Sequence, residues 1–357
     1  MVKSNVVIVD YEMEIACREL ITDCRPRRLE FDSESDRSNF LAIKLSEKVI
    51  GRIPFSFNPI RTGSTVTVSK PGLQGILSSL DSGKITSKAW ADFISNRIVP
   101  DNVKGPVVTN ISACATGLFS FVRGAMLLTN DECDICLAGA AEATLHPFVV
   151  GGFKRMGVIS KTRPRPFDKN RDGFVPAEGG AVALLMREAD AVSEGIKSVA
   201  KILGWAMMQS DSNPVSVKEN EHNIVELIQL ALTNAEIKKQ DLAYIHLHGT
   251  GTKQNDIAEA KALRIIFDKK NIFIPASSTK ALTGHCLGAA GAVETIITIE
   301  FLKNGMAPAS FGLEDIDPEC QCDCILQNNM RLQKSIGIIL SYGFGGQMAA
   351  LVIEAEK

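Results

Sequence analysis

The chain carries almost no excess of charge. Its 39 lysine and arginine residues are balanced by 41 aspartate and glutamate residues, so the net charge at pH 7 is −2. Proteins that bind nucleic acid or an anionic membrane surface by electrostatics need a basic excess or a basic stripe, so neither partner is expected. Apolar runs of the roughly 18 to 20 residues that span a membrane are missing. Asp10, Glu12 and Glu14 follow the first apolar run too soon for a secretory signal.

Cysteine is also too sparse to define the fold. Nine cysteines among 357 residues do not make a disulfide framework. Apolar residues make up 45% and charged residues 22% of the chain, as in ordinary globular proteins rather than disordered or coiled-coil ones. A chain of this length can bury a large core, either as one big domain or as two fused halves. We therefore expect a reduced, cytoplasmic, globular protein.

Short apolar runs alternate with helical patterns, which predicts an α/β protein with covered sheets. The runs typical of strands are residues 6–9, 107–108, 135–138, 181–186, 244–247, 272–275, 336–340 and 349–353. The segments with 3.6-residue periodicity are residues 119–128, 224–232, 257–266 and 290–302. No linker rich in proline, glycine or serine divides the chain. The weakly patterned stretch 210–223 marks the boundary that we expect, between residues 1–209 and residues 210–357.

Two pairs of segments are similar to each other within the chain. Residues 106–128 and 272–302 both contain an extended apolar run, a turn of small residues, and a helix that begins with small residues. More loosely, residues 134–143 and 335–346 both end a strand in small residues. These similarities suggest an internal duplication.

Cys114 is the strongest candidate for a nucleophile. It lies in the sequence SACATG, directly after an expected strand and at the start of an expected helix. Free backbone N–H groups and the positive end of the helix dipole favour a thiolate at such a position, and the backbone N–H of the cysteine can help to bind an oxyanion. The structural alternative is a small buried cysteine at a tight junction between strand and helix.

Histidine is scarce, with five in the chain, and two of the five lie beside glycine after an expected strand. These are His248, in HGTGT, and His285, in KALTGH. A neighbouring glycine lets a substrate or another backbone approach the imidazole closely, and α/β proteins place functional groups at the ends of strands. A single histidine of this kind is usually structural; two of them together with Cys114 indicate an active site.

Nucleotide and metal sites are poorer interpretations. The glycine-rich runs lack the spacing of a P-loop or of a dinucleotide-binding fingerprint. The first cysteine cluster, Cys133 and Cys136, runs into a strand and has no second pair at zinc spacing. Cys320, Cys322 and Cys324 lie in an expected loop and are the better zinc candidate, although no metal is expected.

Five motifs in a fixed order resemble the β-ketoacyl-acyl carrier protein synthases of the thiolase superfamily, in their elongating Cys-His-His group. The motifs are ACATG around Cys114, RPFDKNRDGFVPAEGGAVALL at 165–185, HGTGTKQND at 248–256, STKALTGHCLGAAGAVE at 278–294 and GFGG at 343–346. The resemblance covers the chain from about residue 106 onward. It implies a five-layered α-β-α-β-α fold built from two similar halves, a dimer, and an enzyme that catalyses a decarboxylating Claisen condensation without an organic cofactor.

The resemblance also implies roles for individual residues. Cys114 would accept an acyl chain from acyl carrier protein as a thioester. His248 and His285 would donate hydrogen bonds to the malonyl thioester carbonyl and stabilise the enolate that remains after loss of CO2. Lys280, paired with the acid at Glu294, would maintain the charge and hydrogen bonding around the two histidines.

Three further residues match positions that contact the substrate in the family. Phe344 matches the phenylalanine that gates the acyl pocket, and its backbone N–H would complete an oxyanion hole with that of Cys114. Thr250 and Thr252 match threonines that contact the phosphopantetheine arm. The chain departs from the family at Gln347, where a threonine is usual, and in the missing glycine-rich turn after the first strand.

Two other functions use the same motifs. The chain could be a largely non-catalytic partner subunit that sets chain length in a heterodimer, although such subunits usually lack the cysteine. It could also transfer or hydrolyse acyl groups on Cys114 without condensation, although the decarboxylation histidines are both present. The acyl length, the primer, the pathway and the choice between a homodimer and a heterodimer do not follow from the sequence.

Overall fold

The computed structural model describes residues 5–17, 19–31, 36–82, 98–210, 221–267 and 272–356. Ten of the strands in this part of the chain form one mixed sheet, in the order β2-β4-β5-β1-β6-β12-β11-β7-β8, with β3 paired to β4. The strands are β1 Val6–Ile15, β2 Thr62–Ser64, β3 Thr67–Val68, β4 Ile135–Glu142, β5 Gly179–Arg187, β6 Ala200–Gln209, β7 Tyr244–His246, β8 Ala276–Ser277, β9 Met306–Ala307, β10 Met330–Arg331, β11 Ile336–Tyr342 and β12 Gln347–Ala355. The helices are α1 Arg37–Ile50, α2 Leu73–Asp81, α4 Thr116–Thr129, α5 Pro147–Arg155, α6 Glu188–Ser193, α7 Glu221–Asn234, α8 Lys253–Ile266, α9 Lys280–Thr283 and α10 Ala290–Lys303.

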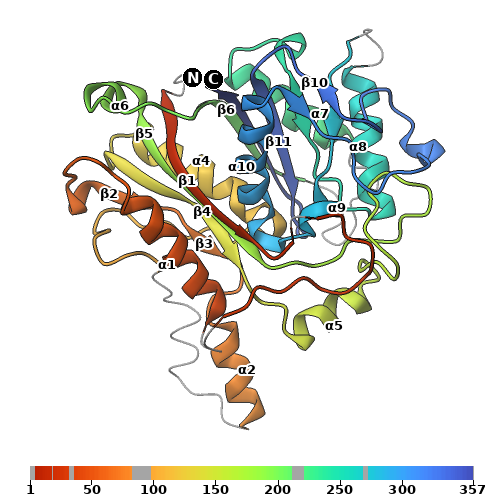
Figure 1. Cartoon of the computed structure of the whole chain (residues 1–357), viewed down its shortest axis with the longest axis horizontal. Coiled ribbons are helices and arrows are strands. Elements are labelled where there is room, and N and C mark those ends of the chain that lie inside the picture. Colours follow the sequence, from red (N-terminus) through yellow and green to blue (C-terminus); the bar gives the residue numbers. More distant parts are fainter. Residues whose placement is uncertain are drawn as a thin grey trace.

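The elements stack in five layers, which confirms the predicted α-β-α-β-α fold (Figure 1). Helix α1 covers the outer face of the part of the sheet formed by β1, β4 and β5, with which it shares a buried apolar cluster. The nearly all-buried helices α4 and α10 lie in the middle, between this part and the strands β6, β11 and β12. Helices α7 and α8 cover the outer face of the latter strands. The two ends of the chain lie next to each other in Figure 1.

The sheet itself shows the duplication. In one part β4 pairs antiparallel with β5 and parallel with the short strand β2. In the other part β11 pairs antiparallel with β12 and parallel with the short strand β7. The antiparallel pairing of β1 with β6 joins the two parts. The predicted division at residues 209 and 210 stays a prediction, since residues 211–220 lie outside the described segments.

The two central helices begin in the same way. Each has 14 residues and follows a 3₁₀ turn, η2 at Ala113–Ala115 and η5 at Leu287–Ala289. The first residue of each turn has a positive φ, 46° at Ala113 and 48° at Leu287, although neither is glycine. Such a conformation costs on the order of 1 kcal/mol and persists only where the surroundings enforce it. The similar segments 106–128 and 272–302 therefore fold into equivalent structures.

Two expected strands are shorter than the sequence suggested. Val107 forms a single bridge to Ser64 and remains 38% exposed, because no further strand of the described chain lies beside it. The run 272–275 contributes only the carbonyl of Pro275, which accepts from Ile245 N, because proline has no N–H for the ladder. The strand β8 then covers Ala276–Ser277. The remaining expected strands and all four expected helices are present.

Candidate active site

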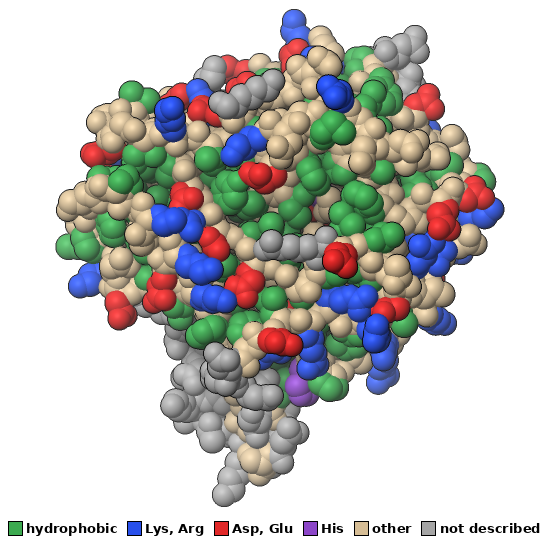
Figure 2. All heavy atoms as spheres, viewed as in Figure 1, with side chains coloured by type: hydrophobic (Ala, Val, Ile, Leu, Met, Phe, Trp, Pro, Cys, Tyr) green, Lys and Arg blue, Asp and Glu red, His purple; other side chains and the backbone are tan. Residues whose placement is uncertain are grey.

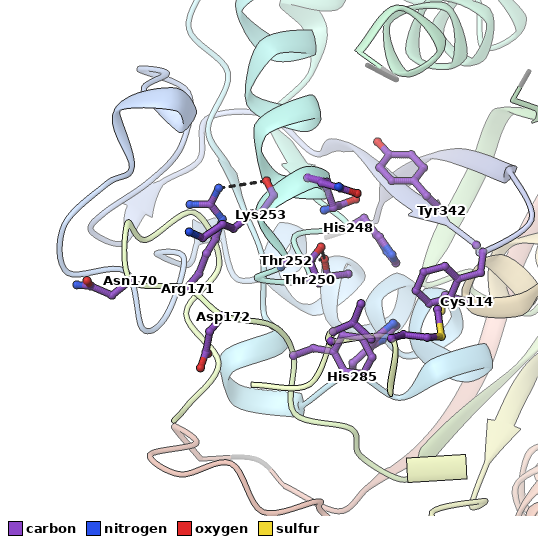
Figure 3. Close-up of a pocket in the computed structure, with 18 of the residues that line it drawn as sticks. Cys114, Asn170, Arg171, Asp172, His248, Thr250, Thr252, Lys253, His285 and Tyr342 are labelled. Carbon is purple, nitrogen blue, oxygen red and sulfur yellow. Dashed lines mark hydrogen bonds between the residues drawn. The ribbon is translucent and has the colours of Figure 1, made fainter. Parts of the chain in front are cut away.

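One cavity of about 860 Å³ brings Cys114, His248 and His285 together. In Figure 3 the sulfur of Cys114 and the two imidazoles face one shared space. Cys114 comes from the turn before α4, His248 from the loop after β7, and His285 from the loop between α9 and η5. The site is therefore assembled from turns and loops that belong to both halves of the fold.

Cys114 sits at the tight turn that precedes α4. The residue is 6% exposed, and its carbonyl accepts a hydrogen bond of 3.0 Å from Ser341 Oγ near the end of β11. Burial raises the pKa of the Cys114 thiol to about 11, although the positive charges of Lys70 and Lys280 lower it. The expected thiolate is thus opposed by desolvation, and the resting site holds a protonated thiol at neutral pH.

The two histidines lie close together and are uncharged. Their ring centroids are 5.6 Å apart, with an interplanar angle of 83°. Burial, followed by the positive charge of Lys280, holds the pKa of both imidazoles well below the ordinary value. A neutral imidazole carries one N–H donor and one acceptor nitrogen. Each ring can therefore donate a hydrogen bond to an oxygen in the cavity without being protonated first.

Lys280 and Glu294 form a buried ion pair behind the histidines. Lys280 Nζ contacts Glu294 Oε1 and donates a 2.5 Å hydrogen bond to the carbonyl of His248. Burial raises the pKa of Glu294 to about 7, against the lowering effect of Lys280. The pair thus ties α9 and α10 to the loop that carries His248.

The loop after β7 is fixed by a second carboxylate, that of Glu259 on α8. Its two oxygens accept from His248 N at 2.8 Å and from Gly249 N at 2.7 Å. In the same loop the hydroxyls of Thr250 and Thr252 are 2.8 Å apart, and both residues line the cavity. The backbone thus holds the imidazole of His248 and the two threonines at the same side of the cavity.

Phe344 lies in the C-terminal loop at the edge of the cavity. The preceding Gly343 packs so closely that a Cβ there would lie 2.5 Å from Ser112 O and 3.4 Å from Cys114 N. This contact brings the backbone of the loop next to the nucleophile. Gly345 and Gly346 follow with φ of 95° and 83°, a region that favours glycine.

Other kinds of site find no support within the described residues. No group of three His, Cys, Asp or Glu side chains is placed to hold a metal ion there. None of the described helices has the length and apolar composition of a membrane span.

Comparison with known families agrees with this geometry. The family model for the N-terminal domain of beta-ketoacyl synthases matches residues 61–191, and the model for their C-terminal domain matches residues 199–314. The chain belongs to the β-ketoacyl synthase family. The sequence-based assignment to this family is therefore confirmed.

Curated relatives of this β-ketoacyl synthase include 3-oxoacyl-[acyl-carrier-protein] synthases and polyketide synthase subunits. The 3-oxoacyl-[acyl-carrier-protein] synthase 2 of Coxiella burnetii is 28% identical over 85% of this chain and 73% of its own length. The ketoacyl synthase alpha subunit of the tetracenomycin polyketide synthase from Streptomyces glaucescens is 32% identical over 71% of this chain, but only 61% of its own length. The chain thus spans less than two thirds of some of its relatives.

Solved structures show the same fold. The type II polyketide ketosynthase described in complex with its acyl-carrier protein has a TM-score of 0.88, with 21% identity and 99% of both chains covered. The ketosynthase described in complex with its chain length factor from Xenorhabdus doucetiae has a TM-score of 0.78, with 22% identity and 98% of both chains covered.

Several residues of this β-ketoacyl synthase site were missed in the sequence. Tyr342 and Phe174 line the cavity, and the ring of Phe174 meets that of His285 edge-on at 4.8 Å. Arg171 is fully buried and bridges Asp256 at 3.4 Å and Asp317 at 2.6 Å, which locks the segment 165–176 to α8. Arg171 and Phe174 lie inside a quoted motif, so the motif itself was the available signal.

Proposed function

We propose that the protein catalyses the decarboxylative condensation of an acyl group held on Cys114 with malonyl-acyl carrier protein. The observation that carries the proposal is the meeting of one thiol and two neutral imidazoles in a single cavity. A thiol alone would suit acyl transfer or hydrolysis. Two uncharged N–H donors beside it suit a reaction in which negative charge develops on a carbonyl oxygen.

In the first step Cys114 Sγ attacks the acyl thioester. The new sulfur–carbon bond forms as the bond to the pantetheine sulfur breaks, and the proton of the Cys114 thiol ends on the departing pantetheine sulfur. A neutral histidine can relay this proton, because its free ring nitrogen accepts it and returns it. The backbone N–H groups of Cys114 and Phe344 would bind the oxyanion of this step.

In the second step the malonyl group loses CO2. The electron pair of the breaking carbon–carbon bond passes into the thioester, where His248 and His285 would donate hydrogen bonds to the enolate oxygen. The enolate carbon then attacks the acyl group on Cys114, which gives a β-ketoacyl thioester and a cysteine thiolate. Uptake of one proton restores the thiol.

Lys280 and Glu294 would serve this step without touching the substrate. The ammonium of Lys280 disfavours a second positive charge nearby, so both histidines remain neutral donors. Thr250 and Thr252 would hold the phosphopantetheine arm at the mouth of the cavity. No metal or organic cofactor enters either step.

For the partner we propose an acyl carrier protein that docks at the mouth of the cavity. Lys253 and Lys169 line the cavity and are exposed, and Lys169 is paired with Asp315. Figure 2 shows further basic side chains over the region where Figure 1 places α5, a helix that ends in the exposed Lys154 and Arg155. This is the charge that an acidic carrier would meet. We also propose that the protein works as a dimer in the cytoplasm.

Intact-protein mass spectrometry tests the proposal. The wild type, Cys114→Ala and the control Cys286→Ala are mixed with a panel of acyl carrier proteins bearing acyl chains, and malonyl-acyl carrier protein is then added. We expect an acyl adduct on the wild type and on Cys286→Ala only, discharged as a β-ketoacyl carrier protein two carbons longer. An adduct that never elongates would identify a transferase or hydrolase, and no adduct at all would favour the non-catalytic partner subunit.

A further inference from the structure

Tyr342 is the last residue of β11 and connects three parts of the site. Its ring lines the cavity and lies 5.2 Å from the ring of His248, with an interplanar angle of 65°. The residue before it, Ser341, donates the hydrogen bond to the carbonyl of Cys114, and the loop that carries Phe344 follows directly after it. A displacement of Tyr342 would therefore reach the nucleophile, His248 and the loop.

The hydroxyl of Tyr342 faces away from the nucleophile. In Figure 3 the ring lies beside His248, with its oxygen turned away from Cys114. The residue is 4% exposed, and the hydroxyl makes no hydrogen bond of ordinary geometry. Burial, and after it the negative charge of Glu259, raise the pKa of the Tyr342 phenol well above its usual value. The hydroxyl is thus a buried donor beside a buried carboxylate.

Glu259 is the acceptor on which the His248 loop depends. Besides the N–H groups of His248 and Gly249, its carboxylate accepts from Asn255 Nδ2 at 2.9 Å. A buried hydroxyl destabilises the fold while it is unpaired, so a small movement that pairs it with the carboxylate is favourable. That movement would bring β11 and α8 together around the imidazole of His248.

We propose that Tyr342 is a positioning residue for the condensation: its ring supports the imidazole of His248, and its hydroxyl donates a hydrogen bond to the carboxylate of Glu259. This inference rests on the proposed function of the site. The hydrogen bond from Tyr342 to Glu259 would make the loop at 343–346 and the backbone of His248 move as one unit. A phenylalanine at the position of Tyr342 would keep the ring but lose the connection to Glu259.

The link to Glu259 gives the proposal a pH signature. The groups that act on this carboxyl are the backbone of Gly249 and of His248, Asp256 and Asn255 on its own helix, Lys280 from α9, and Tyr342 from β11. Burial raises the pKa of Glu259 to about 7, so the group titrates within the working range. A hydroxyl donor stabilises the ionised form, and its removal raises the pKa further. As the solution is acidified, activity that needs the ionised carboxylate is then lost at a higher pH than in the wild type.

The experiment measures CO2 release from malonyl-acyl carrier protein between pH 5.5 and 9 for the wild type, Tyr342→Phe and the control Tyr244→Phe. Tyr244 is also fully buried, and its hydroxyl lies 2.7 Å from Ser277 Oγ rather than beside Glu259. We expect Tyr342→Phe to shift the acid limb of kcat upward by about one pH unit, a tenfold change in the ionisation constant. Its KM should stay within about twofold and its activity should recover above pH 8.5, while Tyr244→Phe keeps the wild-type limb.

A second measurement separates this proposal from the proposed function. The ring resonance of His248, assigned among only five histidines with a His248→Asn variant, is titrated in the resting protein. Because this imidazole itself stays neutral, the midpoint of its chemical-shift change reports the ionisation of Glu259, which binds the backbone of His248. We expect this midpoint to be higher in Tyr342→Phe than in the wild type and in Tyr244→Phe, whether or not CO2 is released. Superimposable midpoints, or a loss of kcat that is equal at every pH, would overturn the role of the hydroxyl. A midpoint that is higher in Tyr342→Phe than in the wild type, together with a wild type that releases no CO2, would overturn the proposed function and leave the contact to Glu259 supported.

Discussion

Lys280→Met tests the buried ion pair most directly. Lys280 and Glu294 are both 1% exposed, so the substitution leaves a carboxyl buried without its cation. Breaking a buried pair in this way costs on the order of 3 to 5 kcal/mol. The same change removes the hydrogen bond to the carbonyl of His248. We therefore expect a folded but weakened protein that no longer releases CO2.

The sign of the pH dependence follows from the pKa of Glu294. Burial raises it from 4.5 to about 7 in the native state, so the native state binds the proton more tightly than the unfolded state. Stability then falls as pH rises from about 4.5, and in the wild type the fall ends near pH 7. Without Lys280 the pKa of Glu294 rises further, so the stability of the variant continues to fall above pH 7. Between pH 7 and 8.5 the variant should lose about 2 kcal/mol more than the wild type, at about 1.4 kcal/mol for each pH unit.

Urea unfolding of the wild type and Lys280→Met at pH 6, 7 and 8.5 measures this loss. The double variant Lys280→Met/Glu294→Gln is the control, because a neutral amide removes the titrating group while keeping its shape. We expect the extra loss at pH 8.5 to disappear in the double variant. A single variant whose deficit is the same at all three pH values would refute the reasoning, since the deficit would then arise from packing alone.

Two other predictions concern the nucleophile and the packing beneath it. Alkylation of Cys114 by iodoacetamide should accelerate about tenfold for each pH unit between pH 7 and 9, because the pKa of its thiol is about 11. The variant Lys70→Met should slow the alkylation severalfold at pH 8, because it removes a nearby positive charge. Equal rates in the wild type and Lys70→Met would contradict the role of Lys70. Gly117→Ala should lower the free energy of unfolding by about 2 kcal/mol or more, because its Cβ would lie 2.4 Å from Ala292 N. The control Gly75→Ala has open space around it and should raise stability by about 0.5 to 1 kcal/mol.

The sequence predicted the parts of the site that lie in short local patterns. Cys114, His248 and His285 sit among small residues near strand-like runs, so they could be chosen as candidates before their distances were known. Only His248 lies directly after a strand, because Cys114 follows the single bridge at Val107 and His285 follows α9. Glu259 and Tyr342 could not be deduced in this way. They come from an ordinary amphipathic helix and the end of an ordinary strand, and only the tertiary fold brings one beside the other.

Burial was the other property hidden from the sequence. The turn at Cys114 favours a thiolate when it is considered alone, but the packing around it raises the pKa of the thiol. The same holds for the edge of the sheet. Val107 has the side chain of a strand residue, yet it forms one bridge because no further strand of the described structure pairs with it. Local patterns specify which conformation a segment prefers, whereas desolvation and pairing depend on neighbours that are distant in the chain.

The matching turns before α4 and α10 have a consequence for how chemistry can be divided within one polypeptide. Counted from Ala113 and Leu287, the position of Cys114 in one turn is that of Gly288 in the other, where a side chain would collide with Ser69 and Glu142. Two identical halves related by symmetry would have to place the same residue at both turns. Because both halves are encoded in one chain, the turn before α4 can hold a reactive sulfur, while the turn before α10 has a glycine at the matching position and follows the catalytic candidate His285. In a single chain with two similar halves, each half can therefore carry a different residue at the matching position.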